Sequence, residues 1–308
     1  MSVFQAIILG VVQGIAEFLP ISSSGHLAVA QRLFGLEDVP LLFDVMLHLA
    51  TLAAVILYFR KKIARLFAIL FRWIFTSGKQ EGKAFPSATM ASPFSPTPSA
   101  GESPATPPAN TELDLLTGTD TLGRKTILAV IFATLVTGVI GVFTSKLIPE
   151  LPIKVTCAGF IVTACLLIFS SLWAKKQDSK KSGEPKGISI PQSLFIGFMQ
   201  GIGTLPGISR SGSTIAGAQL AGVNRAAAGE FSFIVSIPAI LGAFVLEAKD
   251  LGEVGSQIGV LPVFCGCLAA FAWGYLSLSI LMKLIRRGKL EWFACYLIPL
   301  GILGLIFF

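Results

Sequence analysis

A short polar stretch lies inside an apolar segment near the N-terminus of this 308-residue chain. Its polar side chains are one amide, one carboxylate, three hydroxyls and one imidazole: Gln13, Glu17, Ser22, Ser23, Ser24 and His26. An ionisable side chain near the middle of a bilayer costs ~2.5–3.5 kcal/mol on insertion scales, so such residues tend to be functional. Hydroxyls beside a carboxylate and an imidazole are typical of nucleophilic and acid–base catalysis. The stretch is therefore the first candidate for a site.

The same pattern recurs later in the chain. With a shift of 187 residues, eight of the sixteen positions from 10 to 25 are identical in both copies. The identical positions of the first copy are Gly10, Gln13, Gly14, Ile15, Ile21, Ser22, Ser24 and Gly25. The reactive positions differ and pair Glu17 with Thr204, Ser23 with Arg210, and His26 with Ser213. Packing of small residues between helices would explain the glycines and serines, but not the charged positions. The pattern thus indicates an internal repeat in which one copy carries an acid and a hydroxyl and the other a permanent cation.

Composition places these motifs in a membrane. Hydrophobic residues make up 53% of the chain, charged residues 13%, and the mean hydropathy is +0.77. A soluble domain has about 25% charged residues, so the composition predicts a polytopic, all-α membrane protein and excludes a soluble or purely structural role. The net charge of +7 is concentrated in short loops, where it reports topology. We therefore expect no nucleic-acid partner.

The two motifs are expected to lie in re-entrant helical hairpins. The leg after the first serine motif, residues 26–34, would span roughly 14 Å as a helix, about half of a hydrocarbon core. The second copy is equally short, so we predict hairpins at 3–34 and 191–223. An irregular hairpin tip is tolerated at this depth only when it is buried in protein or lines a polar cavity. Two such hairpins at corresponding positions of two halves indicate a binding site near the bilayer midplane.

About six further segments are apolar enough to cross the membrane. They are Phe43–Tyr58, Thr126–Ser145, Pro152–Trp173, Glu230–Leu246, Ile258–Leu284 and Trp292–Phe308. The basic loops should be cytoplasmic, which leaves three crossings between the hairpins and both chain ends outside. The hairpins then enter from opposite sides, as in an inverted repeat. We predict a single membrane domain over 1–308, with repeat one at 1–174 and repeat two at 190–308.

Two segments fall outside this scheme. Residues 63–75 are apolar but contain two arginines seven residues apart, which favours an interfacial helix over a span. Residues 78–123 are rich in Pro, Ser, Thr and Ala. Such a composition cannot bury enough apolar surface to offset its ordering entropy, so we expect a disordered cytoplasmic insertion without catalytic groups.

The motifs resemble a known family. Gln13-x-x-x-Glu17 followed by Pro20-Ile-Ser-Ser-Ser-Gly-His26, with Pro206-Gly-Ile-Ser-Arg210-Ser-Gly-Ser-Thr214 later, is similar to the undecaprenyl-diphosphate phosphatases of the bacitracin-resistance type. The resemblance covers almost the whole chain apart from the Pro-rich insertion. It implies a multi-pass protein of the bacterial inner membrane whose site faces the periplasm. The implied reaction removes the terminal phosphate of a polyprenyl diphosphate, which recycles the lipid carrier of cell-wall synthesis and confers bacitracin resistance.

The resemblance also implies roles for individual residues. The acidic motif falls on Gln13 and Glu17, the serine motif on Ser22, Ser23, Ser24 and His26, and the arginine motif on Ser209, Arg210, Ser211 and Thr214. The family's activity depends on a divalent cation, here Mg²⁺ or Ca²⁺ at Glu17. Gln13 is an amide where many relatives have a second carboxylate, so the ion would need phosphate oxygens or water as further ligands. The oligomeric state stays open, and a homodimer is one of the states allowed.

The chemistry of the residues agrees with this assignment. Arg210 can bind two phosphate oxygens with its planar guanidinium group. The hydroxyls of the two tips would donate hydrogen bonds to the phosphate, together with the amide of Gln13. These hydroxyls belong to Ser22, Ser24, Ser209, Ser211 and Thr214. For the nucleophile we favour Ser23, activated by His26 or Glu17, with metal-activated water as the competing route. His48, with Asp44 four residues before it, is expected to have a structural or peripheral role.

Parts of the sequence pattern are also found in proteins with two other functions. A lipid-phosphate flippase or transporter could use the same inverted repeat and bind phosphate without breaking a bond. A second class of membrane lipid phosphatases also contains Ser-Gly-His and Ser-Arg pieces, but needs a nucleophilic histidine after the Ser-Arg pair. Both histidines of this chain precede Arg210, which excludes that class.

Overall fold

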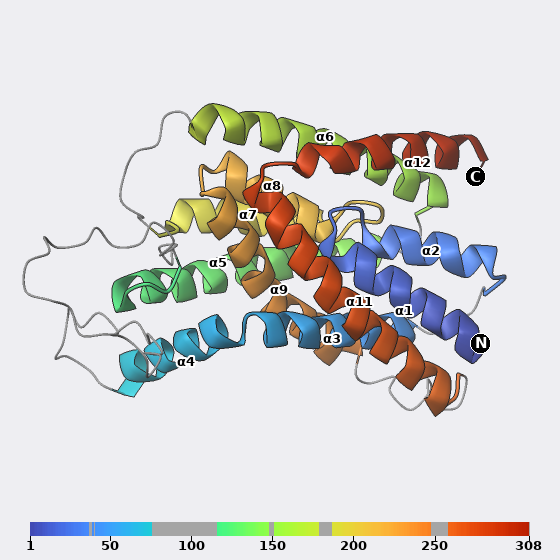
Figure 1. Ribbon diagram of the computed structural model, residues 1–308, viewed down its shortest axis with the longest axis horizontal. Helices are drawn as coiled ribbons and strands as arrows, with labels where there is room; N and C mark the ends of the chain where they lie inside the picture. The colour runs from blue at the N-terminus through green and yellow to red at the C-terminus, as the bar shows by residue number, and fades with distance from the viewer. Residues whose placement is uncertain are drawn as a thin grey trace, which may run out of the picture.

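The computed structural model describes residues 1–36, 39, 41–75, 116–147, 151–178, 187–247 and 258–307, and within these ranges all regular structure is helical. The helices, shown in Figure 1, are α1 (Val3–Phe18), α2 (Ser23–Leu33), α3 (Leu41–Tyr58), α4 (Arg60–Phe75), α5 (Asp120–Leu147), α6 (Ile153–Asp178), α7 (Ile190–Ile202), α8 (Arg210–Leu220), α9 (Arg225–Glu247), α11 (Val260–Arg286), the 3₁₀ helix η3 (Leu290–Phe293) and α12 (Ala294–Phe307).

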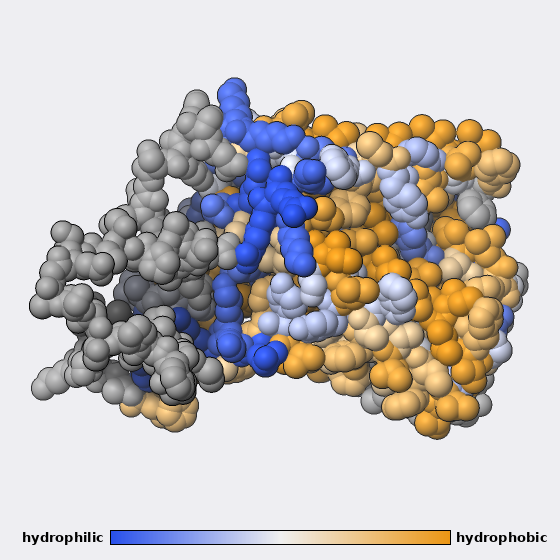
Figure 2. Space-filling model, viewed as in Figure 1, coloured by the Kyte–Doolittle hydropathy of each residue, from blue (hydrophilic) through white to orange (hydrophobic). Residues whose placement is uncertain are grey.

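The chain is a multi-pass membrane protein. Five spans, in α5, α6, α9, α11 and η3–α12, are long and apolar enough to cross a bilayer, and a sixth is counted if α3 and α4 are taken together. These two helices meet at an angle of 80°. Large apolar side chains cover much of the outer surface, and Figure 2 shows them over most of one face, next to a hydrophilic band near one end. A surface of this kind suits lipid rather than water, which confirms the predicted fold class.

Both predicted re-entrant hairpins are present as pairs of short helices. The first consists of α1, with 16 residues, and α2, with 11; the second consists of α7, with 13, and α8, with 11. An 11-residue helix is roughly 16 Å long, about half of a hydrocarbon core. The breaks contain a proline each, Pro20 and Pro206, which cannot continue a helical hydrogen-bond ladder. A returning leg of 11 residues is therefore too short to cross a bilayer by itself.

The two tips meet inside the molecule. In Figure 1 the first hairpin opens toward the end that carries both termini, and the second opens toward the opposite end. Ser211 Oγ of the second tip donates a hydrogen bond of 3.1 Å to the carbonyl oxygen of Phe18 in the first. A Cβ atom placed on Gly212 would lie 3.0 Å from Pro20 Cβ. This is the face-to-face arrangement that the inverted repeat predicts.

The two hairpins pack in equivalent ways against long helices. Gly10 on α1 faces the backbone of α11, where an added Cβ would lie 2.1 Å from the Gly266 carbonyl oxygen. Its repeat counterpart Gly197 on α7 faces α5, where an added Cβ would lie 2.5 Å from the Ala133 carbonyl oxygen. The repeated glycines therefore mark close helix contacts rather than chemistry. The assigned repeat boundaries, 1–174 and 190–308, stay predictions.

The predicted disordered insertion, residues 78–123, is wrong at its C-terminal end. Leu116 and Thr117 are buried, and α5 already begins at Asp120. Leu116 packs in a cluster with Leu66 and Ile69 of α4, and its carbonyl oxygen accepts a hydrogen bond of 2.8 Å from Thr126 Oγ1. Composition missed this because apolar contacts with α4 offset the ordering entropy of these few residues. Residues 78–115 lie outside the described part of the chain.

Candidate functional site

Glu17, in the last turn of α1, is the centre of the polar site. Its side chain is 4% exposed, yet four other side chains reach its carboxylate. Ser23 Oγ donates a 2.7 Å hydrogen bond to Oε2, and Gln13 Nε2 donates one of 2.9 Å to the same oxygen. The guanidinium of Arg210 pairs with Oε1, and His48 Nε2 lies 3.4 Å from Oε2. The site therefore joins α1, α2, α3 and α8.

Local geometry explains how the hairpins deliver these groups. Gln13 and Glu17 are four residues apart and share one face of α1. Ser23 is the first residue of α2, and Arg210 is the first residue of α8. Each of these side chains therefore stands directly after the break of its hairpin. The predicted meeting of Ser23 and Arg210 takes place on the two oxygens of one carboxylate.

The buried ion pair shapes what the site can do. A buried charge that loses its partner is destabilised by ~3–5 kcal/mol, so Glu17 and Arg210 each need a counter-charge. A phosphate group can bind the same guanidinium as Glu17, because both present paired oxygens. The site thus brings a hydroxyl, a carboxylate and a guanidinium together at one point.

The hydroxyls of the second tip form hydrogen bonds with backbone groups of the same tip and of the first tip. Ser209 is the N-cap of α8 and its Oγ accepts a 3.1 Å hydrogen bond from the Gly212 amide. Thr214 Oγ1 donates a 2.6 Å bond to the Arg210 carbonyl oxygen, and Ser211 Oγ donates to Phe18 as described above. These bonds fix the backbone that carries Arg210.

In the first tip, Ser22 and Ser24 differ in exposure. Ser22 is buried and has a positive φ of 71°, and Ser24 is exposed. Their hydroxyl oxygens are 3.5 Å apart. Neither residue is among those that contact Glu17 in the described part of the chain.

His26 points away from Glu17. Its Nδ1 lies 2.8 Å from the Ser22 carbonyl oxygen, and its Nε2 lies 2.8 Å from the Tyr296 hydroxyl of α12. The ring also packs against Phe160 of α6, with ring centroids 5.2 Å apart. Both ring nitrogens therefore have partners other than Ser23. Of the two activating groups considered from the sequence, Glu17 is the one bonded to the serine hydroxyl.

His48 is a site residue that sequence reasoning did not find. The sequence predicts a structural or peripheral role for His48 and Asp44, but His48 Nε2, on α3, lies 3.4 Å from Glu17 Oε2. The structural expectation fits Asp44 better, since its carboxylate accepts a 2.8 Å hydrogen bond from Gln31 at the end of α2. The sequence does contain a feature that could have identified His48: it is an ionisable residue inside an apolar span, as Glu17 is, and such residues tend to be functional.

The second repeat lacks an acid at the equivalent place. Thr204, the counterpart of Glu17, shares a 2.8 Å hydrogen bond with Thr144 of α5. Gln200, the counterpart of Gln13, donates a 3.0 Å bond to Thr137 Oγ1. Gln200 also lines a small cavity that is lined by Glu17 and Arg210 as well. The acid of the site therefore comes from the first tip and the permanent cation from the second.

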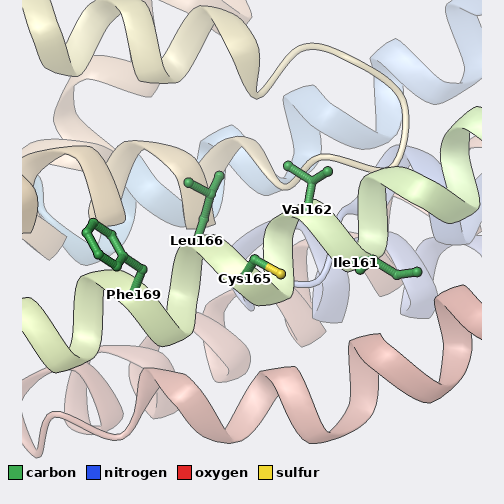
Figure 3. A pocket seen from close by; sticks show the side chains of 5 residues that line it. All are labelled: Ile161, Val162, Cys165, Leu166 and Phe169. Carbon is green, nitrogen blue, oxygen red and sulfur yellow. The ribbon is translucent and has the colours of Figure 1, made fainter.

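An apolar groove on α6 offers a contrast with this site. Figure 3 shows its lining side chains, which are Ile161, Val162, Cys165, Leu166 and Phe169. The set contains no charged group and no hydrogen-bonding oxygen or nitrogen in its side chains, so the groove cannot carry phosphate chemistry. The cluster around Glu17 is the part of the described structure that can.

Comparisons with known proteins find relatives that match nearly the whole chain. The family model described as bacitracin resistance protein BacA matches residues 6–303. The chain is 44% identical to an undecaprenyl-diphosphatase of Treponema denticola over 302 residues, covering 98% of this chain and 96% of the relative. It is 34% identical to an undecaprenyl-diphosphatase of Carboxydothermus hydrogenoformans over 312 residues, covering 99% and 97%. A relative of the same name from Borrelia recurrentis is 33% identical, with 100% and 98% covered.

Proposed function

Since the chain belongs to the bacitracin resistance protein BacA family, we propose that it is an undecaprenyl-diphosphate phosphatase. The enzyme removes the terminal phosphate of undecaprenyl diphosphate and yields undecaprenyl phosphate and inorganic phosphate. Recycling of this lipid carrier supports cell-wall synthesis and bacitracin resistance. The observation that carries the proposal is the convergence of Ser23, Glu17 and Arg210 from two oppositely inserted hairpins.

Arg210 binds the substrate. A diphosphate carries several negative charges that repel an attacking oxygen, so catalysis depends on neutralising charge and on in-line positioning. The Arg210 fork binds two oxygens of the terminal phosphate and releases Glu17 from its ion pair. Its backbone is fixed by the Thr214 and Ser209 bonds described above, so the fork is held in place before substrate arrives.

Ser23 is the nucleophile and Glu17 accepts its proton. Ser23 Oγ attacks the terminal phosphorus, the bond to the bridging oxygen breaks, and undecaprenyl phosphate leaves. The hydroxyl proton moves to the Glu17 carboxylate, which already accepts the 2.7 Å hydrogen bond of Ser23 Oγ. In the second half, water attacks the phosphoserine phosphorus and the bond to Ser23 Oγ breaks. Glu17 returns its proton to Ser23 Oγ, and inorganic phosphate leaves with both hydrogens of the water. Direct attack by activated water is the competing route, and a phosphoserine intermediate distinguishes the two.

The residues around Glu17 fit a divalent cation, for which Mg²⁺ and Ca²⁺ are our candidates. Gln13 Oε1 is buried and has no hydrogen-bond partner among the described residues, and oxygen ligands suit hard cations. The described ranges contain no group of three His, Cys, Asp or Glu side chains around one point, so a bound cation would need phosphate oxygens and water as further ligands. A bound cation supplies charge neutralisation at the terminal phosphate.

We place the enzyme in the bacterial inner membrane with the site reached from the periplasm. Basic residues lie in the last turns of α4, α6 and α11, which are at the end of the molecule opposite the termini in Figure 1. The positive-inside rule assigns that end to the cytoplasm. The termini, which lie at the other end in Figure 1, are then periplasmic.

Phosphate release from a polyprenyl diphosphate in the presence of Mg²⁺ tests the function. We expect the purified protein to release phosphate, and Ser23→Ala and Arg210→Ala to abolish release. Ser279→Ala is a matched control, because Ser279 is partly exposed on α11 and its hydroxyl donates to the Tyr275 carbonyl oxygen, away from Glu17. Release that survives both site substitutions would contradict the site. Absence of release from the wild type would favour lipid-phosphate transport instead.

A further inference from the structure

The imidazole of His48 is the one group at Glu17 that the mechanism above does not use. Its side chain is 25% exposed, against 4% for Glu17, and its Nε2 lies 3.4 Å from Glu17 Oε2. The ring is therefore directed at the carboxylate and only partly covered by protein. An imidazole in an apolar span requires a partner or a function.

The hydrogen bond at the far side of the ring decides which nitrogen is available. His48 Nδ1 lies 2.7 Å from the backbone carbonyl oxygen of Asp44. A carbonyl oxygen only accepts hydrogen bonds, so Nδ1 carries the hydrogen and the lone pair of neutral imidazole is on Nε2. Metal-binding histidines almost always donate their second ring N–H to a carbonyl or carboxylate in this manner. The ring is thus oriented as a ligand with Nε2 toward Glu17.

The distance between the two candidate ligand atoms fits a shared ion. Nε2 and Glu17 Oε2 are 3.4 Å apart, which is longer than a usual hydrogen bond of about 2.7–3.2 Å. Two nitrogen and oxygen ligands at about 2.1 Å from a metal are roughly 3.0–3.4 Å apart at octahedral to tetrahedral angles. The spacing therefore suits two neighbouring positions in one coordination shell.

Gln13 supplies a second, independent pointer to a ligand. Gln13 is fully buried and its Nε2 is bonded to the same Glu17 oxygen. Its Oε1 has no hydrogen-bond partner in the described structure, although a buried amide oxygen is normally satisfied. A water molecule on an ion at Glu17 would donate to it.

We propose that His48 Nε2 and Glu17 Oε2 together ligate the divalent cation of this enzyme. The proposal rests on the proposed function and deepens it. It also changes the expected ion, because an imidazole ligand favours transition metals over Ca²⁺ and Mg²⁺. Mn²⁺ accepts both carboxylate and imidazole ligands, so the site should bind Mn²⁺ more tightly than Mg²⁺, by roughly tenfold.

Pulsed electron paramagnetic resonance of bound Mn²⁺ tests the ligand directly. The chain contains only two histidines, so the full-length protein, purified with a histidine-free tag, has two candidate imidazoles. We expect a nitrogen coupling to Mn²⁺ in the wild type, its loss in His48→Gln together with at least tenfold weaker Mn²⁺ binding, and its persistence in His26→Gln. A coupling that is absent from the wild type, persists in His48→Gln or disappears in His26→Gln would overturn the proposal.

Two measurements keep the result interpretable. Wild-type protein labelled with ¹⁵N-histidine must change the coupling if a histidine is the ligand, and this needs no folded His48→Gln protein. Phosphate release is measured on the same samples. Release without a nitrogen coupling would overturn the His48 ligand and leave the proposed function intact. A coupling without release would overturn the proposed function and support the metal site.

Discussion

The two hairpin tips have the same frame and different chemistry. Gly10 and Gly197 make equivalent close contacts with α11 and α5, and a glutamine stands three positions after each of them. At the reactive positions the first tip has Glu17 and Ser23, whereas the second has Thr204 and Arg210. Two identical tips would place like charges together, which is unfavourable in a buried site. Both copies of the repeat therefore have the same backbone arrangement, while the acidic side chain lies in the first copy and the basic side chain in the second.

The strongest test of this division compares Glu17 with its counterpart Thr204. Glu17→Gln removes the proton acceptor of Ser23 and the counter-charge of Arg210, so we expect phosphate release to fall by about 10³-fold or more. Thr204→Val removes only the hydrogen bonds to Thr144 and Gly201 and should leave release within about threefold. Initial rates at saturating substrate measure both. Comparable losses in the two variants would mean that the position of Glu17 is no more important for the reaction than its counterpart in the second repeat.

A second test concerns how the tips turn. Gly207 has φ +77°, and an added Cβ would lie 1.8 Å from the Thr156 carbonyl oxygen. Gly207→Ala should lower the free energy of unfolding by about 3 kcal/mol or more, because strain and overlap add. Gly35→Ala is the control: φ is +65° but nothing lies within 4 Å, so only about 1–2 kcal/mol is expected. Thermal unfolding in detergent compares them, and equal shifts would show that the close approach to α6 is unimportant.

The paired glutamines give a smaller difference. Gln13→Met removes the amide that holds Glu17 and should reduce phosphate release about tenfold with little loss of stability. Gln200→Met removes a hydrogen bond to Thr137 and should cost about 1 kcal/mol of stability while release stays within about twofold. Rates and unfolding midpoints are measured on both. The reverse pattern would assign the functional amide to the second repeat.

The smallest effect is expected at the edge of the first tip. Tyr296→Phe removes the hydroxyl bonded to His26 Nε2, and we expect a loss of about threefold in phosphate release through misorientation of the ring. Tyr275→Phe is a control on α11 that keeps its ring contact with Tyr58. If both variants behave alike in the release assay, the Tyr296 hydroxyl does not position His26.

Much of this arrangement could be predicted from the sequence. Short apolar legs around Gly, Ser and Pro revealed the hairpins, and the odd number of crossings between them predicted that their tips would meet. Ser23 and Arg210 do lie close together, but the sequence predicted a phosphate between them and not the Glu17 carboxylate that both contact. What the sequence could not show depends on how separate helices pack. His48 reaches Glu17 because of the position of α3 beside α1, and His26 turns toward Tyr296 because α12 lies next to it. The ordered residues 116–123 likewise depend on contacts with α4.

One consequence follows from where α2 and α8 begin. Both helices start at the centre of the molecule, with Ser23 and Arg210 as their first residues. A helix carries roughly half a positive elementary charge at its N-terminus, so the two N-termini together present about one positive elementary charge beside Arg210. A multiply charged anion can therefore be bound between the two tips without a second arginine.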